Sequence, residues 1–147
     1  MEGQLLAALE LKAQVGPSFA NNFNSRAEEA LGTALDLWTA YREGAFQTTP
    51  RPFLGFLFLL EDAPESRTPV SVREPYFPVF AEFRDASYVK RYELLCRKMV
   101  LARHYTAACF LVADRKKANR QENYFEPAGD LSAQVFLSEL LRHILRR

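Results

Sequence analysis

The first strand-length segment of the chain joins an apolar run to two opposite charges. Residues 5–9 are apolar, and the run ends in Glu10-Leu11-Lys12, with Gln14 two residues further on. Because side chains alternate along a strand, Glu10, Lys12 and Gln14 project from one face. Charges on a buried strand are costly unless they bind something. The segment therefore predicts either a solvated Glu/Lys pair at a strand end or a functional site.

Two further apolar segments have the length of strands. Residues 53–60 form a continuous run typical of a strand buried on both faces, and residues 105–112 form a third such segment. Helical patterns at residues 25–44 and 87–103 separate the three strands, and a third helical pattern, at residues 130–144, follows the last strand. The alternation of strand and helix predicts an α/β fold with a mixed β-sheet flanked by helices.

The bounds and apolar faces of the helices follow from local patterns. The first helix is expected to begin at Ser25, in a capping box with Glu28, and to end near Gly44. Asp130 is the expected cap of the last helix. The expected core-facing residues of the first helix are Ala27, Leu31, Ala34, Leu35, Trp38 and Tyr41, and those of the last are Ala133, Leu137, Leu140, Leu141 and Ile144.

Two segments are expected to be loops. Residues 15–24 are rich in Gly, Pro and Asn. Residues 62–86 contain four prolines and little periodicity, and long loops of this kind are commonly functional or held by aromatic side chains. The aromatic residues expected to hold this loop against the body are Tyr76, Phe77, Phe80 and Phe83.

The bulk composition sets the class of protein. A chain of 147 residues suits one domain, and its formal net charge of +1 neither requires nor excludes a nucleic-acid partner. Cys96 and Cys109 lie among apolar residues, which favours buried free thiols in a reducing cytosol over a disulfide. The apolar runs are too short to span a bilayer, and no basic leader precedes one of them, so we expect a cytoplasmic protein.

The first strand begins almost at Met1. Residues 1–4 look like the end of a hairpin turn whose preceding strand is absent. We therefore expect the strand containing Glu10 to have an unpaired edge.

Several motifs together resemble one family. They are residues 10–19 (ELKAQVGPSF), 21–26 (NNFNSR), 28–34 (EEALGTA), 36–44 (DLWTAYREG), 59–65 (LLEDAPE), 77–80 (FPVF) and 91–97 (RYELLCR). The chain resembles the XhoI-type restriction endonucleases, which recognise the palindrome CTCGAG. The likeness covers most of the chain up to about Ala113.

This resemblance implies a PD-(D/E)xK nuclease fold and a Mg²⁺-dependent type II deoxyribonuclease that cuts double-stranded DNA. Glu10 would be a metal ligand and Lys12 the catalytic lysine, with the backbone carbonyl of Leu11 completing the metal's coordination. Gln14 is a further site candidate. Palindromic recognition implies a two-fold homodimer for the full-length enzyme.

The sequence departs from the family pattern in one respect. The other essential acid of this fold, an Asp on the preceding strand, has no counterpart, and Glu2 is the only acid before Glu10. We therefore expect a single restriction-endonuclease-like domain over residues 1–147 that corresponds to the C-terminal part of a longer enzyme. Two alternatives stay open: a non-catalytic DNA-binding or complementing module, and a nuclease of the same fold with a role such as repair.

Candidate DNA contacts lie in three places. Asn21, Asn22 and Asn24 can read base edges or simply form a turn. Arg26 is expected near a helix start, where a phosphate or carboxylate would offset its charge, whereas Glu29 and Asp36 are expected to face solvent. The densest basic cluster can contact phosphates or be a solvated loop, and it consists of Arg115, Lys116, Lys117 and Arg120.

Overall fold

A computed structural model describes residues 4–46, 50–117 and 123–146, so Glu2 and Arg120 lie outside the described residues. These residues form a sheet of four strands in the order β1 (Ala7–Gln14), β2 (Phe53–Glu61), β3 (Ala107–Ala113) and β4 (Tyr124–Phe125). The first three strands are parallel, and β4 runs antiparallel to β3. The predicted mixed sheet of an α/β protein is confirmed.

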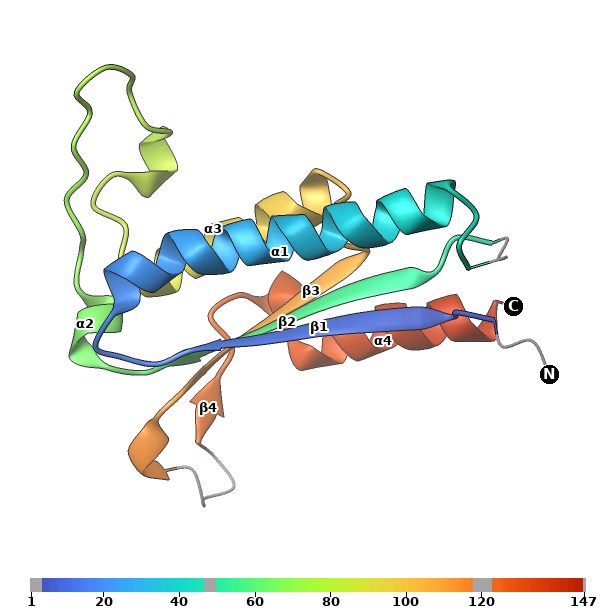
Figure 1. The fold of residues 1–147 in the computed structure, drawn as a ribbon. Coiled ribbons are helices and arrows are strands. Elements are labelled where there is room, and N and C mark those ends of the chain that lie inside the picture. Colours follow the sequence, from blue (N-terminus) through green and yellow to red (C-terminus); the bar gives the residue numbers. More distant parts are fainter. Residues whose placement is uncertain (1–3, 47–49, 118–122, 147) are drawn as a thin grey trace.

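Helices cover both faces of the sheet. Figure 1 shows α1 (Phe19–Arg42) and α3 (Tyr88–Leu101) on one face and α4 (Ala133–Leu145) on the other. The strand β2 lies between β1 and β3, so most of its side chains are buried, as the continuous apolar run predicts. Both thiols are buried and free, as expected. None of the helices in the described ranges is long and apolar enough to cross a membrane.

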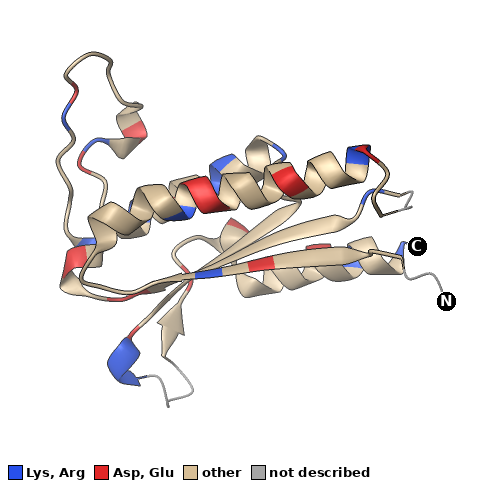
Figure 2. Ribbon diagram, in the orientation of Figure 1, with Lys and Arg blue, Asp and Glu red and all other residues tan. Residues whose placement is uncertain are grey.

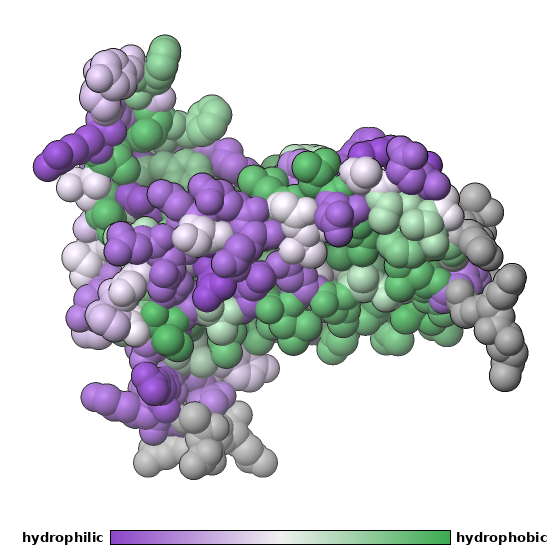
Figure 3. Space-filling view, viewed as in Figure 1, coloured by the Kyte–Doolittle hydropathy of each residue, from purple (hydrophilic) through white to green (hydrophobic). Residues whose placement is uncertain are grey.

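One edge of β1 is open. Within the described residues β1 pairs with β2 alone, as the sequence predicts for its edge. The amide of Phe53 donates to the carbonyl of Leu6, so the parallel ladder directs the backbone groups of even-numbered residues of β1 to β2. Odd-numbered residues, including Leu9 and Leu11, direct theirs to the open edge. The side chains of Leu9 and Leu11 are also exposed. Figure 3 shows hydrophobic residues gathered along β1 and the adjoining α4.

The start of α1 differs from the prediction. The helix begins at Phe19 rather than at Ser25, which lies inside it, so Ser25 and Glu28 do not form a capping box. The cause is tertiary packing: Phe19 is buried and its ring stacks on Tyr88 at 5.7 Å between centroids. Burial of this ring outweighs the weak helix propensity of the Asn residues that follow it.

The buried face of α1 is also narrower than predicted. Ala30, Ala34 and Trp38 are buried at four-residue spacing, whereas Leu31 and Leu35 are exposed. The small side chains of the two alanines let the helix lie close to the sheet. With this face of α1 turned to the sheet, Leu31 and Leu35 point outward. The predicted stop is correct, since α1 ends at Arg42 and Gly44 adopts a positive φ of 77°.

The last helix is capped by a different residue from the one predicted. Ser132 accepts a hydrogen bond from the amide of Val135 and caps α4. Asp130 instead lies in the short helix η3 (Gly129–Leu131) and pairs with Arg97. The predicted stripe of α4 is correct in part. Ala133 and Leu140 pack against the core beside the buried Phe136, which was not predicted, whereas Leu137 and Leu141 are exposed.

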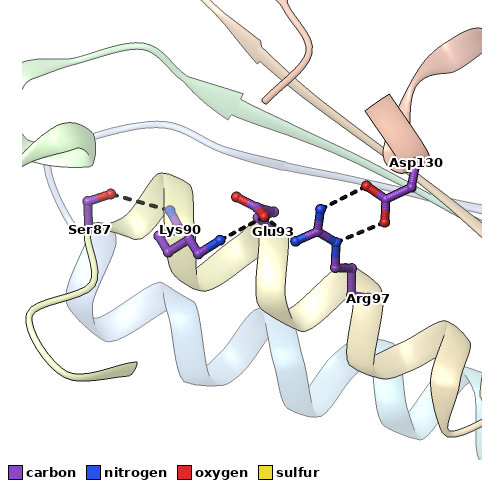
Figure 4. A network of polar contacts seen from close by, with 5 residues as sticks. All are labelled: Ser87, Lys90, Glu93, Arg97 and Asp130. Carbon is purple, nitrogen blue, oxygen red and sulfur yellow. Dashed lines mark hydrogen bonds and ion pairs between the residues drawn. The ribbon is translucent and has the colours of Figure 1, made fainter. Parts of the chain in front are cut away.

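Polar contacts join α3 to η3. Figure 4 shows Arg97 between Glu93, on its own helix, and Asp130, to which it makes two hydrogen bonds of 2.8 Å. Lys90 also reaches Glu93, at 2.8 Å. The carboxylate of Glu93 is nearly buried and therefore requires such partners.

The proline-rich segment is partly ordered by its own short elements, α2 (Pro64–Arg67) and the helix η1 (Ala81–Phe83). Between them the chain projects from the body on the helix side of the sheet, beside the N-terminal end of α1 (Figure 1). Tyr76 and Phe77 are exposed, so the expectation that they hold the loop against the body is wrong for these two. Phe80 is also exposed, but its ring lies 4.8 Å from the ammonium of Lys98 of α3. Phe83 is half-buried.

Candidate active site

The carboxylate of Glu10 lies between three elements. It is on β1, beneath α1, and its side chain is only 8% exposed. Thr33 of α1 donates a hydrogen bond of 3.2 Å to one carboxylate oxygen, and the hydroxyl of Tyr105, just before β3, contacts the other. These contacts fix the orientation of Glu10 at the edge of the sheet.

The hydroxyl of Tyr105 lies near two hydrogen-bond acceptors. It lies 2.8 Å from the carbonyl of Ala30 and also against Glu10, and it has a single proton to donate. Burial, and then the neighbouring Glu10, raise the pKa of Tyr105 above its ordinary value. The tyrosine is therefore neutral and acts as a donor near Glu10.

Lys12 lies between two carboxylates. Its ammonium is 3.3 Å from Glu10 and 3.1 Å from Glu29 of α1. The hydrogen bond to Glu29 is the main cause of a raised pKa for Lys12, and burial partly opposes it. Glu10 and Lys12 therefore share one face of β1, as the alternation of side chains predicts.

Glu29 is exposed on α1, as predicted, and it also pairs with two cations. Although its side chain remains 43% exposed, it accepts a hydrogen bond of 2.7 Å from Arg26 as well as contacting Lys12. Arg26 first, and then Lys12, lower the pKa of Glu29. The expected carboxylate partner of Arg26 is therefore Glu29, and Arg26 lies about two turns into α1 rather than in its first turn.

The oxygen atoms at this edge have the chemistry that a hard cation requires. Glu10 offers a carboxylate, and the carbonyl of Leu11 points to the open edge of the sheet rather than to β2. Mg²⁺ is commonly held by one or two carboxylates together with water and phosphate oxygens. Among the described residues, no three Asp, Glu, His or Cys side chains gather as a metal-binding group.

Gln14 is placed differently from Glu10 and Lys12. It is only 2% exposed, and its amide nitrogen donates to the carbonyl of Val15 at 2.6 Å. Gln14 therefore lies away from the solvent-accessible part of the site, and its role in DNA binding stays a prediction. Its carbonyl oxygen has no hydrogen-bond partner within the described part of the chain.

The other candidate DNA contacts do not converge on one surface. Asn21, Asn22 and Asn24 lie in the first turns of α1 rather than in a loop, and Asn21 and Asn24 are exposed. The basic cluster forms the short helix η2 (Arg115–Lys117), on the other side of the sheet from α1 (Figure 2). Lys117 lies 3.4 Å from Asp114.

Three residues at the site were missed by sequence reasoning. Glu29 and Thr33 lie one turn apart on α1, and this polar row beside the buried alanines is a signal that could have identified them. Tyr105 has no such signal, because only the packing of β3 beside β2 brings it near Glu10.

The fold and this site define an α/β protein with a carboxylate–ammonium cluster at an open sheet edge. The family model described as "Restriction endonuclease XhoI" matches residues 1–125. The chain therefore belongs to the XhoI restriction endonuclease family. No solved structure matches it.

Three curated relatives are similar to this chain. Type II restriction enzyme BstVI of Geobacillus stearothermophilus is 57% identical over 143 residues, which are 97% of this chain and 63% of the relative. Type II restriction enzyme XhoI of Xanthomonas vasicola is 57% identical over 67% of this chain and 40% of the relative. Type II restriction enzyme AbrI of Azospirillum brasilense is 66% identical over 50% of this chain and 33% of the relative. The chain thus spans less than two thirds of the length of each.

Proposed function

We propose that this chain is part of a type II restriction endonuclease that hydrolyses DNA phosphodiester bonds at a specific palindrome with Mg²⁺. The observation that carries the proposal is the Glu10–Lys12 pair, on one face of an edge strand in a chain of this family. We further propose a PD-(D/E)xK core, a homodimeric full-length enzyme and action on double-stranded DNA in the cytoplasm.

Glu10 and the carbonyl of Leu11 would hold the Mg²⁺. When bound, the cation would lower the pKa of a water and offset negative charge on the phosphate. Lys12 would lie beside the attacking water and a nonbridging phosphate oxygen, and in-line attack would leave a 5′-phosphate and a 3′-hydroxyl.

The surrounding residues would keep this pair in place. Thr33 and Tyr105 orient the carboxylate of Glu10, and Glu29 holds the ammonium of Lys12 close to it. When a phosphate enters, its oxygens would compete with Glu29 for Lys12, because Glu29 is the more exposed of the two carboxylates. Glu29 is thus proposed as a positioning residue.

The other essential acid of this nuclease fold, an Asp on the strand before Glu10, is needed for activity and has no counterpart in this sequence. No Asp precedes Glu10 in this sequence, and the relatives are longer than this chain. We propose that the 147 residues form one nuclease-like domain, and that a further segment supplies the other acid. A non-catalytic DNA-binding or complementing module remains the second candidate, since the described residues bring no three metal-binding side chains together.

Cleavage of plasmid DNA separates the two candidates. With Mg²⁺ and high protein concentration, the purified chain is tested on a plasmid that contains the recognition site. Cutting that Lys12→Ala abolishes would show that this chain is catalytic without a further segment and would reject the module. The matched control is Lys98→Ala, on α3, because the ammonium of Lys98 pairs with Glu82 and not with Glu10 or Glu29. If the wild-type chain does not cut, the module is the correct description of this chain.

Metal binding tests Glu10 without requiring cleavage. Calorimetric titration with Mn²⁺ is expected to give heat for the wild-type chain and none for Glu10→Ala. The stability of Glu10→Ala should differ little from that of the wild type. In this variant Tyr105 can still donate a hydrogen bond to the carbonyl of Ala30, and Lys12 still pairs with Glu29. Equal heats for both proteins would contradict the role of Glu10.

A further inference from the structure

Three buried side-chain atoms have no hydrogen-bond partner within the described part of the chain. They are Oε1 of Gln14 on β1, Nε of Arg26 on α1 and the hydroxyl oxygen of Tyr92 on α3. Gln14 is 2% exposed and Tyr92 is fully buried. A buried polar atom without a partner is costly, and nearly all such atoms in folded proteins bond to protein or to ordered water. The three atoms are therefore a candidate binding site.

The polar contacts between β1 and α1 fix the alignment of these two elements. Thr33 contacts Glu10, whereas Glu29, one turn earlier on the helix, contacts Lys12, two residues later on the strand. The helix therefore runs antiparallel to the strand. The spacings match, since four helical residues and two strand residues each advance the chain by roughly 6 Å.

This alignment places Arg26 beside Gln14. Gln14 lies two residues beyond Lys12 on the same face of β1, and Arg26 lies three residues before Glu29 on the same face of α1. Helical side chains lean towards the N-terminus of their helix, which is the direction of Gln14. Nη1 of Arg26 donates to Glu29 at 2.7 Å, and Nε is its buried, unpaired atom.

Tyr92 approaches the same place from α3. Its ring stacks on Phe58 at 4.1 Å between centroids, and Phe58 is the partner of Lys12 in the register of β1 and β2. The ring also meets that of Phe23, one turn before Arg26, at 5.0 Å. Burial raises the pKa of Tyr92, and the charge of Arg26 partly opposes this, which agrees with their proximity. The hydroxyl of Tyr92 therefore keeps its proton and can donate.

The chemistry of the three atoms suits one water molecule. The Nε–H of Arg26 and the hydroxyl of Tyr92 can donate, and Oε1 of Gln14 can accept. A water accepts two hydrogen bonds and donates two, and buried waters typically make about three bonds to otherwise unpaired groups. An ion suits the set less well, because an anion would face the oxygen of Gln14 and a cation would face the guanidinium of Arg26.

We propose that Gln14, Arg26 and Tyr92 enclose one water molecule behind the candidate active site, and that this water fixes the guanidinium of Arg26. The water accepts hydrogen bonds from Arg26 and Tyr92 and donates one to Gln14. The guanidinium is then held at two atoms, by the water at Nε and by Glu29 at Nη1. Gln14 and Tyr92 are thus positioning residues.

Through Arg26 this water acts on the ammonium of Lys12. Arg26 holds Glu29, and Glu29 lies 3.1 Å from Lys12. This step rests on the proposed function, in which a phosphate displaces Glu29 from Lys12. The fixed guanidinium would then keep the carboxylate of Glu29 in place on α1, so that it does not follow the ammonium towards the DNA.

NMR of the arginine Nε–H groups tests the water site without DNA or metal. In the wild-type chain the Nε–H of Arg26 is expected to exchange with solvent at least ~10-fold more slowly than that of Arg42, an exposed arginine of the same helix. The same proton should show a cross-peak to a long-lived water. Exchange as fast as that of Arg42, or slow exchange without the cross-peak, overturns the proposal.

Substitutions test the other two groups. Gln14→Met and Tyr92→Phe each remove polar atoms with little change of shape, and each should accelerate exchange at Nε–H of Arg26 at least ~10-fold. Gln14→Glu keeps an acceptor oxygen and should retain slow exchange. Gln134→Met, at an exposed glutamine of α4, is the matched control. Unchanged exchange in both Gln14→Met and Tyr92→Phe rejects the site. If circular dichroism shows that these variants do not fold, the wild-type comparison decides.

The ammonium protons of Lys12 report the effect on the active site. They are expected to give an NMR signal in the wild-type chain, because contacts with Glu10 and Glu29 slow their exchange. The signal should broaden in Gln14→Met and persist in Gln14→Glu and Gln134→Met. A signal that persists in Gln14→Met rejects the positioning role.

These measurements separate the water site from the catalytic function. A chain that shows the long-lived water but does not cut DNA keeps the site and rejects only catalysis by this chain. A chain that cuts DNA while the Nε–H of Arg26 exchanges rapidly rejects the water site alone.

Discussion

At the scale of single residues, the site depends on partners that the Glu-x-Lys motif does not contain. Tyr105 connects Glu10 of β1 to the carbonyl of Ala30 in α1, so one hydroxyl joins the sheet to the helix above it. Glu29 and Thr33 add polar contacts from the same helix. The motif is thus held in position by a helix and by the residue that precedes β3.

We predict that Tyr105→Phe lowers the free energy of unfolding by ~1 kcal/mol, because a buried hydrogen bond is lost without a change of shape. Urea denaturation measures the change. The control is Tyr76→Phe, which removes an exposed hydroxyl of the proline-rich segment and should stay within ~0.5 kcal/mol of wild type. Equal effects of the two substitutions would show that Tyr105 contributes no such bond.

At the scale of elements, β2 requires a glycine where α4 crosses it. A Cβ atom at Gly55 would lie 2.6 Å from the ring of Phe136 and 2.7 Å from the side chain of Leu9. The absence of a side chain therefore lets α4 pack on the sheet. Gly32, in α1, is different, because nothing lies within 4 Å of a Cβ atom placed there.

We predict opposite effects of the same substitution at these two glycines. Gly55→Ala should destabilise the protein by ~1–3 kcal/mol through overpacking. Gly32→Ala should stabilise it by ~0.5–1 kcal/mol, because alanine favours the helix interior. Urea denaturation of both variants measures the difference, and a stable Gly55→Ala protein would mean that α4 packs less closely than described.

At the scale of the whole molecule, ion pairs connect separate elements. Asp62 pairs with Arg67, Glu82 with Lys98, and Asp130 with Arg97. In each case the hydrogen bond to the cationic partner lowers the pKa of the carboxyl. These carboxyls therefore bind protons more weakly in the folded chain than in the unfolded one.

We predict that the thermal midpoint falls as pH drops below the ordinary carboxyl pKa values of 3.8 to 4.5. The stabilisation is fully present above those values and is lost as pH falls through the lowered, folded-state ones. Asp130→Asn should reduce the drop in Tm between neutral and acidic pH, and Asp36→Asn, at an exposed carboxyl of α1, is the control. An identical drop in wild type and Asp130→Asn would contradict the contribution of the Arg97 pair.

The sequence predicted most of the elements and the shared face of Glu10 and Lys12. Residues 53–60 could be identified as a buried strand because an apolar run needs no tertiary context, and Gly44 marked the end of α1. The start of α1 and the burial of Phe136 in α4 could not be identified, because Phe19 and Phe136 pack against rings that are distant in the sequence. The roles of Glu10 and Lys12 remain proposals.

The sequence by itself determined the order of strand and helix, the family, and the common face of Glu10 and Lys12, because periodicity and the alternation of side chains are local properties of the chain. Only the tertiary structure decided that Glu29, Thr33 and Tyr105 surround that pair and that Gln14 is buried. These contacts join elements that are up to 95 residues apart, and their positions depend on how the helices pack on the sheet.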